Sequence, residues 1–244
     1  MIDFPDDFLT ILHSARRVAV LTGAGISKES GVPTFRDKDG LWSKYDPQEL
    51  ATVQAFRDNP QLVWEWYLYR RNIIDGVEPN PGHFALVEME RRYDDFTLIT
   101  QNVDSLHRRA GSQKVLELHG NIARNKCFNC GAPYDGEISV EDGEIPCCSC
   151  GGRIRPDVVW FGEMLPEQVL NEAFEASSQV ELFFSIGTSA LVHPAASMPL
   201  TAKRNGAYLV EVNLEPTPLT ELCDFFVHGP SGEILPEMVA RLSE

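Results

Sequence analysis

Two pairs of cysteines have the spacing of a metal site. Each pair is a C-x-x-C sequence followed by a glycine, and sixteen residues separate the first pair from the second. A C-x-x-C turn aims two thiolates at one point, and two such turns complete the tetrahedral shell that zinc prefers. Cys148 is an alternative to Cys147, but the spacing to Cys150 favours Cys147. The sequence therefore predicts one structural zinc ion, bound by Cys127, Cys130, Cys147 and Cys150.

A glycine-rich turn is the second candidate for chemistry. Gly23, Ala24 and Gly25 directly follow the apolar residues 18–22. Glycine lets backbone amides approach a pyrophosphate closely, because it has no Cβ atom. The common dinucleotide fingerprint has a third glycine where this chain has Lys28. The turn alone therefore leaves a nucleotide site and an ordinary loop equally open.

Polar residues in the middle of the chain are the third candidate. Asn102 and Asp104 follow the apolar residues 96–100, and His119 follows another short apolar run. An amide and a carboxylate could hold a carboxamide and a ribose hydroxyl, although both residue types also cap helices. A histidine in a crevice suits a general base, since its unperturbed pKa is near the working pH, and a structural histidine is the alternative. Arg36 could bind phosphate or form a surface ion pair.

Short apolar runs and helical stretches alternate along most of the chain. The runs cover residues 18–22, 96–100, 180–186 and 208–212, and the helical stretches cover residues 4–15, 81–93, 166–177 and 194–205. Strands that alternate with helices predict an α/β fold with a parallel sheet covered on both faces. Ligands bind such sheets outside the carboxyl ends of the strands. Small or polar residues follow all four runs, which favours a ligand crevice at that edge.

Two segments interrupt this alternation. Residues 43–78 are rich in aromatic side chains and look mainly helical, and residues 124–155 contain five of the six cysteines. We expect these two segments to form a small domain. The large domain would then consist of residues 1–42, 79–123 and 156–244.

The charge balance limits the partners. The 36 acidic residues exceed the 21 basic residues, and the formal net charge is −15. Such a surface repels phosphate backbones, which disfavours a direct nucleic-acid partner. It would attract lysine-rich protein segments, or it would simply keep the protein soluble.

Neither end of the chain nor its longest uncharged stretch predicts a membrane. Asp3, Asp6 and Asp7 stand where a signal peptide has basic residues. Residues 182–202 lack charge, but Gly187 and Pro194 within them predict a strand, a loop and a helix start rather than a membrane span. We therefore expect a cytoplasmic protein whose cysteines are not disulfide-bonded.

An ordered set of motifs resembles one known family. In chain order the motifs are GAGISKESGVPTFR, TQNVD, LHG, the paired C-x-x-C turns, PDVVWFGE, GTS and VNLEP. This set, from about residue 17 to residue 231, resembles the sirtuins. The resemblance implies a Rossmann-like NAD-binding domain and a small domain made of a zinc ribbon and a helical module, with NAD bound between them.

The resemblance also implies which residues contact NAD. Those near the pyrophosphate and the nicotinamide ribose would be Gly23, Ala24, Gly25, Ser27, Thr34, Phe35, Arg36, Trp42, Gln101, Asn102, Val103 and Asp104. Those near the phosphates and the adenosine would be Gly187, Thr188, Ser189, Asn213, Leu214, Glu215 and Ser231.

The implied reaction removes an acyl group from a protein lysine. His119 would be the catalytic base, with Asn102 and Asp104 beside it, and NAD would be consumed to give nicotinamide and 2′-O-acyl-ADP-ribose. The peptide would pair with residues 159–162 by strand addition. Protein ADP-ribosyltransfer is an alternative that uses the same cofactor site, and a non-catalytic NAD- and zinc-binding module is another. The implied substrate-binding residues of the segment are Val159, Trp160, Phe161 and Gly162.

One further pair refines the expected substrate. Tyr67 and Arg70 are one helical turn apart, so both side chains can face one pocket. The pair resembles the Tyr-x-x-Arg pair of sirtuins that remove succinyl, malonyl and glutaryl groups. An arginine fork and a phenol can together bind the distal carboxylate of such an acyl group. The alternative is a packed Tyr67 with a solvated Arg70, and the neighbouring Tyr69 and Arg71 blur the register.

Overall fold

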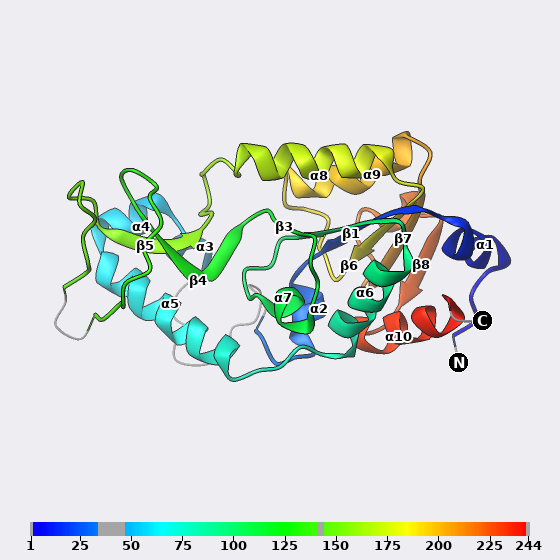
Figure 1. Ribbon diagram of the computed structural model, residues 1–244, viewed down its shortest axis with the longest axis horizontal. Helices are drawn as coiled ribbons and strands as arrows, with labels where there is room; N and C mark the ends of the chain where they lie inside the picture. Colours follow the sequence, from blue (N-terminus) through cyan, green and yellow to red (C-terminus); the bar gives the residue numbers. More distant parts are fainter. Residues whose placement is uncertain (1, 34–46, 141–143, 243–244) are drawn as a thin grey trace.

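A six-stranded sheet forms the centre of the larger part of the molecule (Figure 1). The structure is a computed structural model that describes residues 2–33, 47–140 and 144–242. The strand order is β3-β2-β1-β6-β7-β8, and every pairing in this sheet is parallel. The predicted α/β fold is therefore confirmed. The strands are β1 (Arg17–Thr22), β2 (Asp95–Thr100), β3 (Val115–Glu117), β6 (Leu182–Ile186), β7 (Tyr208–Asn213) and β8 (Phe225–His228).

Helices cover both faces of this sheet, because each parallel connection must cross over it. On one face, α1 (Asp6–Ser14), α6 (Pro81–Arg92) and α10 (Ser231–Leu242) pack on residues such as Val18 and Val20. On the other face, α8 (Glu167–Gln179) and α9 (Met198–Arg204) pack on Ala19 and Leu21. Successive strand residues thus enter opposite cores, which explains why β1 is apolar without interruption.

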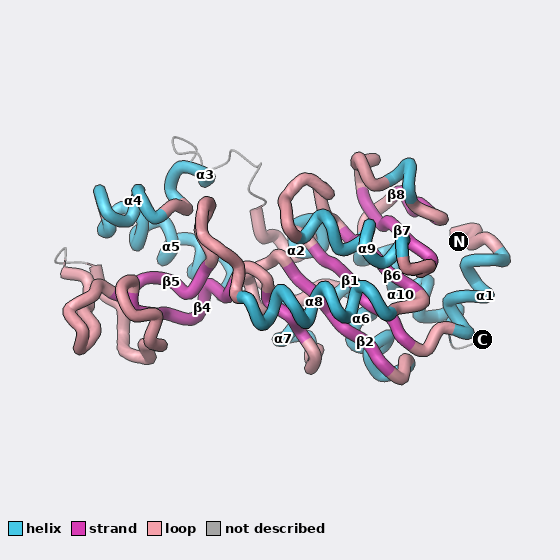
Figure 2. Tube along the Cα trace, turned by 90° about the horizontal axis from the view of Figure 1, so that it is seen from above, coloured by secondary structure: helices cyan, strands magenta, loops and turns pink. Residues whose placement is uncertain are grey.

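A smaller module extends beyond the β3 side of the sheet (Figure 2). It has its own core, in which Phe56, Trp64 and Trp160 are almost completely buried. The side chain of Thr52 accepts from the amide of Ala55 at the start of α4. The helical character predicted for residues 43–78 is confirmed for the part of that segment that the structure describes, while the domain boundaries stay a prediction. The elements of the module are α3 (Pro47–Leu50), α4 (Val53–Asp58), α5 (Pro60–Asp75), β4 (Gly120–Cys127) and β5 (Ile154–Val158).

The direction of the strand order reverses between β1 and β6. From β1 the chain continues to β2 and β3 on one side, and the strands from β6 onward lie on the other side. In open α/β sheets, ligands bind at the carboxyl ends of the strands beside such a reversal. The short helices α2 (Ala24–Lys28) and α7 (Leu106–Ala110) follow β1 and β2 at this edge.

The uncharged stretch has the predicted structure. Residues 182–202 form β6, a loop, a 3₁₀ turn at Ala195–Ser197 and the first part of α9. A second 3₁₀ turn lies at Thr220–Leu222. Across the described ranges, no helix has the length and apolar character that crossing a membrane requires.

Candidate active site

The loops after β1 and β6 meet through their main chains. Gly25 N donates to Gly187 O at 2.9 Å, and Gly23 N donates to Ile186 O at 3.0 Å. A Cβ atom on Gly25 would lie 2.6 Å from Gly187 Cα, and one on Gly23 would lie 2.7 Å from Gly187 O. Gly187 has φ +60°, in the left-handed region that favours glycine. These three positions therefore require glycine, because two backbone segments pass in direct contact.

The predicted amide and carboxylate belong to one hydrogen-bonded chain. Asn102 Nδ2 donates to Gly23 O at 3.0 Å and to Ser27 Oγ at 3.1 Å. Ser27 Oγ donates to Asp104 Oδ2 at 2.7 Å, and Asp104 Oδ1 accepts from Leu106 N at 2.9 Å. Burial raises the pKa of the Asp104 carboxyl, and the hydrogen bonds from Ser27 and Leu106 act in the opposite direction. Asp104 thus both binds the first amide of α7 and ties the β2 loop to the β1 loop.

His119 stands between β3 and β4, at the same edge of the sheet. Its Nδ1 lies 2.9 Å from Gln101 O. A carbonyl oxygen only accepts, so Nδ1 carries the proton of the neutral ring and Nε2 has a lone pair. Burial lowers the pKa of His119, and the hydrogen bond to Gln101 O partly offsets this. The ring is therefore neutral at pH 7, with Nε2 as its basic nitrogen.

The ends of β6 and β7 are also joined. Asn213 Nδ2 donates to Thr188 O at 2.7 Å, and Thr188 Oγ1 lies 3.0 Å from Ser185 Oγ. Thr188 is only 5% exposed, so its backbone position is fixed by both neighbours. Among the other residues predicted near the adenosine, Ser189 is half-buried, whereas Leu214 and Glu215 are exposed.

Ser231 begins α10 and contacts the loop after α2. Its Oγ donates to Glu29 Oε1 at 2.8 Å, and the same carboxylate accepts from Gly232 N at 3.0 Å. Glu29 thereby holds the start of α10 against the glycine-rich segment. Sequence reasoning gave Glu29 no role, although it lies inside the GAGISKESG motif.

Residues 159–162 connect the sheet edge to the small module. Val159 N donates to His119 O at 2.8 Å, and Phe161 N donates to Ala51 O at 2.9 Å. The Phe161 side chain is 47% exposed, whereas that of Trp160 is 1% exposed and lies in the module's core. Of the two aromatic side chains, that of Phe161 is therefore the one accessible to a peptide.

The Tyr67 phenol lies inside the small module, on α5. It is 2% exposed and accepts a hydrogen bond from Trp160 Nε1 at 2.9 Å. Burial raises the pKa of Tyr67 to about 12, and the charge of Arg70 acts in the opposite direction. Burial lowers the pKa of the Arg70 guanidinium, while the nearby Tyr67 and Asp104 raise it. The Arg70 guanidinium lies over the Trp66 ring, with 5.0 Å from Cζ to the ring centroid.

Arg71, the next residue, points elsewhere. Its guanidinium donates to Ile122 O at 2.6 Å, to Arg124 O at 3.2 Å and to Asn125 Oδ1 at 2.7 Å. It also stacks over Trp64, with 5.2 Å from Cζ to the ring centroid. Arg71 thus fastens α5 to β4, which separates its role from that of Arg70.

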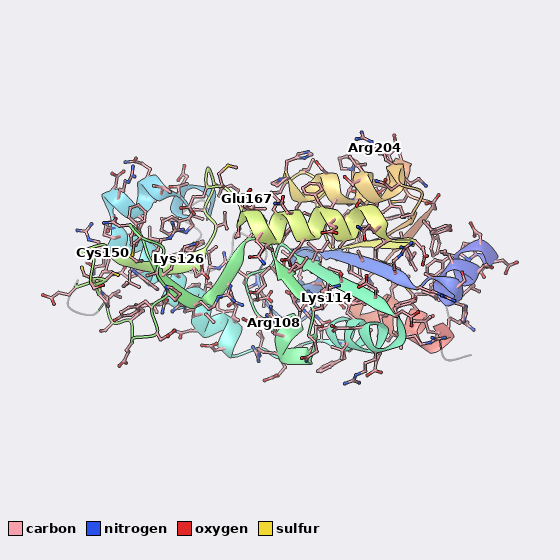
Figure 3. All side chains as sticks on the ribbon, turned by 45° about the horizontal axis from the view of Figure 1, so that its top comes forward. Arg108, Lys114, Lys126, Cys150, Glu167 and Arg204 are labelled. Atoms are coloured by element: carbon pink, nitrogen blue, oxygen red, sulfur yellow. The ribbon has the colours of Figure 1, made fainter. Side chains whose placement is uncertain are left out.

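Four cysteines lie close enough together to hold a metal ion, and the group contains Cys148 where Cys147 was predicted. The Sγ atoms of Cys127, Cys130, Cys148 and Cys150 all lie within 4.8 Å of one another. Zinc–sulfur bonds of about 2.3 Å in a tetrahedron require sulfur–sulfur distances of about 3.8 Å. Cys127 to Cys150 is 3.4 Å and Cys130 to Cys148 is 3.8 Å, so the cluster fits zinc. Cys150 lies towards the far end of the small module from the sheet (Figure 3).

Cys147, which was predicted as a ligand, lies outside this group of sulfur atoms, and its role as a ligand stays a prediction. Cys147 forms an antiparallel bridge with Arg153, and its Sγ is 3.8 Å from Ile145 O. Neighbouring residues of an extended chain point to opposite sides, so only one of two adjacent cysteines can face the cluster. Cys148 N donates to Gly152 O, and Gly151 N donates to Cys148 O. The second turn is therefore one residue tighter than the C-x-x-C spacing suggested, and Cys147 instead lines a surface hollow of about 390 Å³.

The remaining predicted residues lie in the small module, at the sheet edge or outside the described ranges. Val103 is buried in the core of the small module, and its carbonyl accepts from Ile122 N at 2.9 Å. Ala24 and Gln101 are half-buried at the sheet edge, and Gly162 is exposed with φ +86°. The residues outside the described ranges are Thr34, Phe35, Arg36 and Trp42.

A buried ion pair in the substrate segment was missed by sequence reasoning. Arg155 is 3% exposed, and its guanidinium pairs with both carboxylate oxygens of Glu163, at 2.5 and 2.9 Å. Its Cζ lies 3.2 Å from the centroid of the Trp160 ring. Arg155 directly precedes the PDVVWFGE motif and Glu163 is its last residue, but two charges eight positions apart give no sequence signal of pairing.

The fold and the site together define a class of protein. A doubly wound sheet carries an amide, a carboxylate and an imidazole at its switch point, and a four-cysteine module stands beside them. The chain belongs to the Sir2 family, since a sequence model of that family matches residues 23–194.

Relatives extend the match over nearly the whole chain. The NAD-dependent protein deacylase 2 of Pyrobaculum aerophilum is 49% identical over 232 residues, which are 95% of this chain and 93% of the relative. The NAD-dependent protein deacylase of Aquifex aeolicus is 54% identical over 209 residues, or 85% and 87% of the two chains.

Solved structures of Sir2 proteins also match this chain over nearly its whole length. A Sir2 homologue in complex with NAD superposes with a TM-score of 0.93 at 42% identity, covering 99% of this chain and 94% of that one. A Sir2 protein bound to an acetylated peptide has a TM-score of 0.87 at 34% identity and covers 96% of both chains.

Proposed function

We propose that this chain is an NAD-dependent protein-lysine deacylase with one structural zinc ion. The observation that carries the proposal is the His119 ring, whose basic Nε2 stands at the carboxyl edge of the sheet. A neutral imidazole with a fixed tautomer is prepared to accept a proton. The names of the Pyrobaculum and Aquifex relatives support the same activity.

The proposed NAD site lies across the β1–β6 switch point. The glycine contacts between Gly25 and Gly187 leave the main chain there free of side chains, which suits the close approach of phosphates. Asn102, Ser27 and Asp104 would hold the nicotinamide side, and Asn213 and Ser231 would hold the adenosine side. Gln101, Thr188, Ser189, Leu214 and Glu215 complete the proposed contacts within the described residues.

His119 performs the proton transfer in this proposal. NAD would supply an activated ribose: together with the acyl-lysine and water it gives nicotinamide, free lysine and 2′-O-acyl-ADP-ribose. The Nε2 atom of His119 accepts a proton from a ribose hydroxyl while Gln101 O stabilises the charged ring through Nδ1. Residues 159–162 hold the peptide, since they run directly beside His119.

The test is an acylated peptide incubated with and without NAD. We expect loss of the acyl group only with NAD, together with one nicotinamide for each lysine released. Equal deacylation without NAD contradicts the proposal. NAD labelled in its ribose separates the alternatives: label on protein indicates ADP-ribosyltransfer, and no NAD turnover with any peptide indicates a binding module.

We also propose that the enzyme accepts acyl groups with a distal carboxylate, such as succinyl, malonyl or glutaryl. Two observations support this finer assignment. Arg70 follows Tyr67 by three residues on α5, and Tyr67 and Asp104 both influence the pKa of its guanidinium. Arg71 is engaged with β4, which favours Arg70 over Arg71 as the arginine of the pair. A phenol and a guanidinium can together match a carboxylate.

Arg70→Met and Arg71→Met form a matched pair of variants. We expect Arg70→Met to lower the ratio of desuccinylation to deacetylation by about tenfold or more, because a hydrogen bond to a charged group is worth roughly 1.5–3 kcal/mol. Arg71→Met should lower thermal stability and leave the ratio unchanged. Equal loss of both activities in Arg70→Met would assign Arg70 a structural role.

A further inference from the structure

The Tyr67 phenol receives a hydrogen bond from inside the protein. Trp160 Nε1 is 2.9 Å from the phenolic oxygen, and the indole nitrogen is only a donor. Both side chains are almost completely buried, at 1% and 2% exposed. The phenolic oxygen is therefore the acceptor in this pair, and its own proton must point to a different atom.

That proton is retained under working conditions. Burial raises the pKa of Tyr67 to about 12, so the phenol is protonated at neutral pH. Among the described residues, the phenol accepts from Trp160 Nε1 and its own proton has no acceptor. An acceptor from outside the folded chain can therefore take this hydrogen bond.

The Trp160 ring is held rigidly in place. The Arg155 guanidinium lies over its face, with 3.2 Å from Cζ to the ring centroid, and pairs with Glu163 on both oxygens. Glu163 Oε2 also accepts from Trp160 N at 2.8 Å. The cation over the ring draws electron density from the indole, which makes its N–H a stronger donor. Backbone, ring and N–H of Trp160 are thus fixed by one buried ion pair.

We propose that Trp160 is a positioning residue for acyl selectivity: by filling the acceptor side of the Tyr67 phenol, its indole N–H directs the phenolic proton towards the distal carboxylate of the acyl group. The inference rests on the proposed preference for acidic acyl groups and goes beyond it. Arg70 supplies the positive charge that attracts the acyl carboxylate. Because Trp160 already donates to the phenolic oxygen, Tyr67 offers its own O–H to that carboxylate as an additional donor. Trp160 belongs to the peptide-binding segment, so the same three residues connect peptide binding with acyl choice.

Trp160→Phe and Trp64→Phe are the matched pair that tests the inference. Trp64 is also fully buried in the small module, and its Nε1 donates to Ile154 O at 2.9 Å. Each substitution removes one indole N–H and the same volume from the same core. We expect Trp160→Phe to lower the succinyl-to-acetyl ratio of kcat/KM by about tenfold. Any effect of the substitution that is equal for both substrates cancels in this ratio. Trp64→Phe should leave the ratio at its wild-type value.

A double variant tests whether Trp160 acts through Tyr67. Tyr67→Phe should lower the ratio, and Tyr67→Phe combined with Trp160→Phe should lower it no further. Full additivity, or equal ratios in Trp160→Phe and Trp64→Phe, overturns the inference. The indole ¹⁵N–H resonances provide a readout without substrate: Tyr67→Phe should shift the signal of Trp160 and leave that of Trp64 in place. An unshifted Trp160 signal overturns the inference as well.

The two levels of the proposal fail in different ways. If Arg70→Met leaves the succinyl-to-acetyl ratio of kcat/KM at its wild-type value, the acidic-acyl assignment is overturned, and with it the role of Trp160. A ratio that depends on Arg70 but survives Trp160→Phe overturns the role of Trp160 alone.

Discussion

His119 Nδ1 and Gln101 O lie 2.9 Å apart, which joins the loop after β3 to the end of β2. This one contact fixes the tautomer of the imidazole, because a carbonyl oxygen can only accept. It also orients the ring towards the edge of the sheet where the other polar strand ends lie. The geometry of the proposed base thus depends on the main chain of the neighbouring strand.

Removal of the imidazole should abolish turnover without removing the cofactor site. We expect His119→Ala to lower kcat by about 10²–10⁴, which is the usual contribution of a general base. NAD should still raise the thermal unfolding temperature of the variant, since the glycine contacts and Asn102 remain. His228→Ala, at an exposed histidine, is the control and should keep full activity. A variant of His119 with more than a tenth of wild-type kcat would contradict its role as the base.

The same histidine predicts the acid limb of the pH profile. Its pKa in the folded protein lies below 6.5, because burial disfavours the charged ring. At pH 6.5 more than half of the molecules therefore have the neutral, active ring, so kcat/KM should fall by less than about twofold between pH 8 and pH 6.5. The steeper loss should come at lower pH. A half-maximal point above pH 6.5 in the profile of kcat/KM would exclude His119 as the titrating base.

Two adjacent cysteines provide a sharp test of the zinc site. Cys148→Ser should remove most of the zinc and destabilise the small module, because metal binding and folding are coupled in such sites. Cys147→Ser should retain one zinc per chain, since its Sγ faces away from the cluster. Elemental analysis of both purified variants distinguishes the two residues. The reverse result would restore the ligand set predicted from the C-x-x-C spacing.

Acid stability should depend on a buried pair of histidines. His83 and His107 are 0% and 2% exposed, and their ring centroids are 4.9 Å apart. His83 Nδ1 accepts from Asn80 N, and His107 Nε2 contacts Thr22 Oγ1 at 2.9 Å. Burial lowers the pKa of His83 to about 4 and that of His107 well below 6.5. Both rings are therefore neutral in the folded protein.

The direction of the pH effect follows from proton uptake. Below pH 6.5 the unfolded chain binds a proton at each of these histidines and the folded chain does not, so stability decreases as the pH falls. For His83 the decrease runs from pH 6.5 to about pH 4 and amounts to roughly 3 kcal/mol. His83→Asn should flatten the plot of unfolding free energy against pH, measured with urea. An unchanged slope in His83→Asn would show that the ring is already charged in the folded state.

The strands and the switch point could be predicted because their signals are local. An uninterrupted apolar run followed by small residues identifies a buried parallel strand, and β1 and β2 match their predicted ranges within one residue. The helix α10 was not predicted, because Gly232 and Pro236 within it are typical of loops. Its first residues are held by Glu29 from a distant part of the chain, and sequence spacing does not reveal such a contact.

The sequence predicted the residue types of the candidate site, but it did not predict the directions in which several of the side chains point. The order of motifs identified His119 and Asp104 without any knowledge of their hydrogen bonds. Spacing favoured Cys147 over Cys148 and left the arginine register blurred, because adjacent residues differ mainly in where they point. That direction is set by tertiary partners such as Gly152 for Cys148 and the β4 carbonyls for Arg71.

The contact of Gly25 with Gly187 limits how this enzyme can be altered. Where two bare backbones touch, there is no side chain to exchange, and the smallest addition would push the strands' loops apart. A change of cofactor preference, by evolution or by engineering, therefore cannot be made by substitution at these two glycines. It must come from the periphery, where the exposed side chains of Leu214 and Glu215 can be replaced without moving the chain.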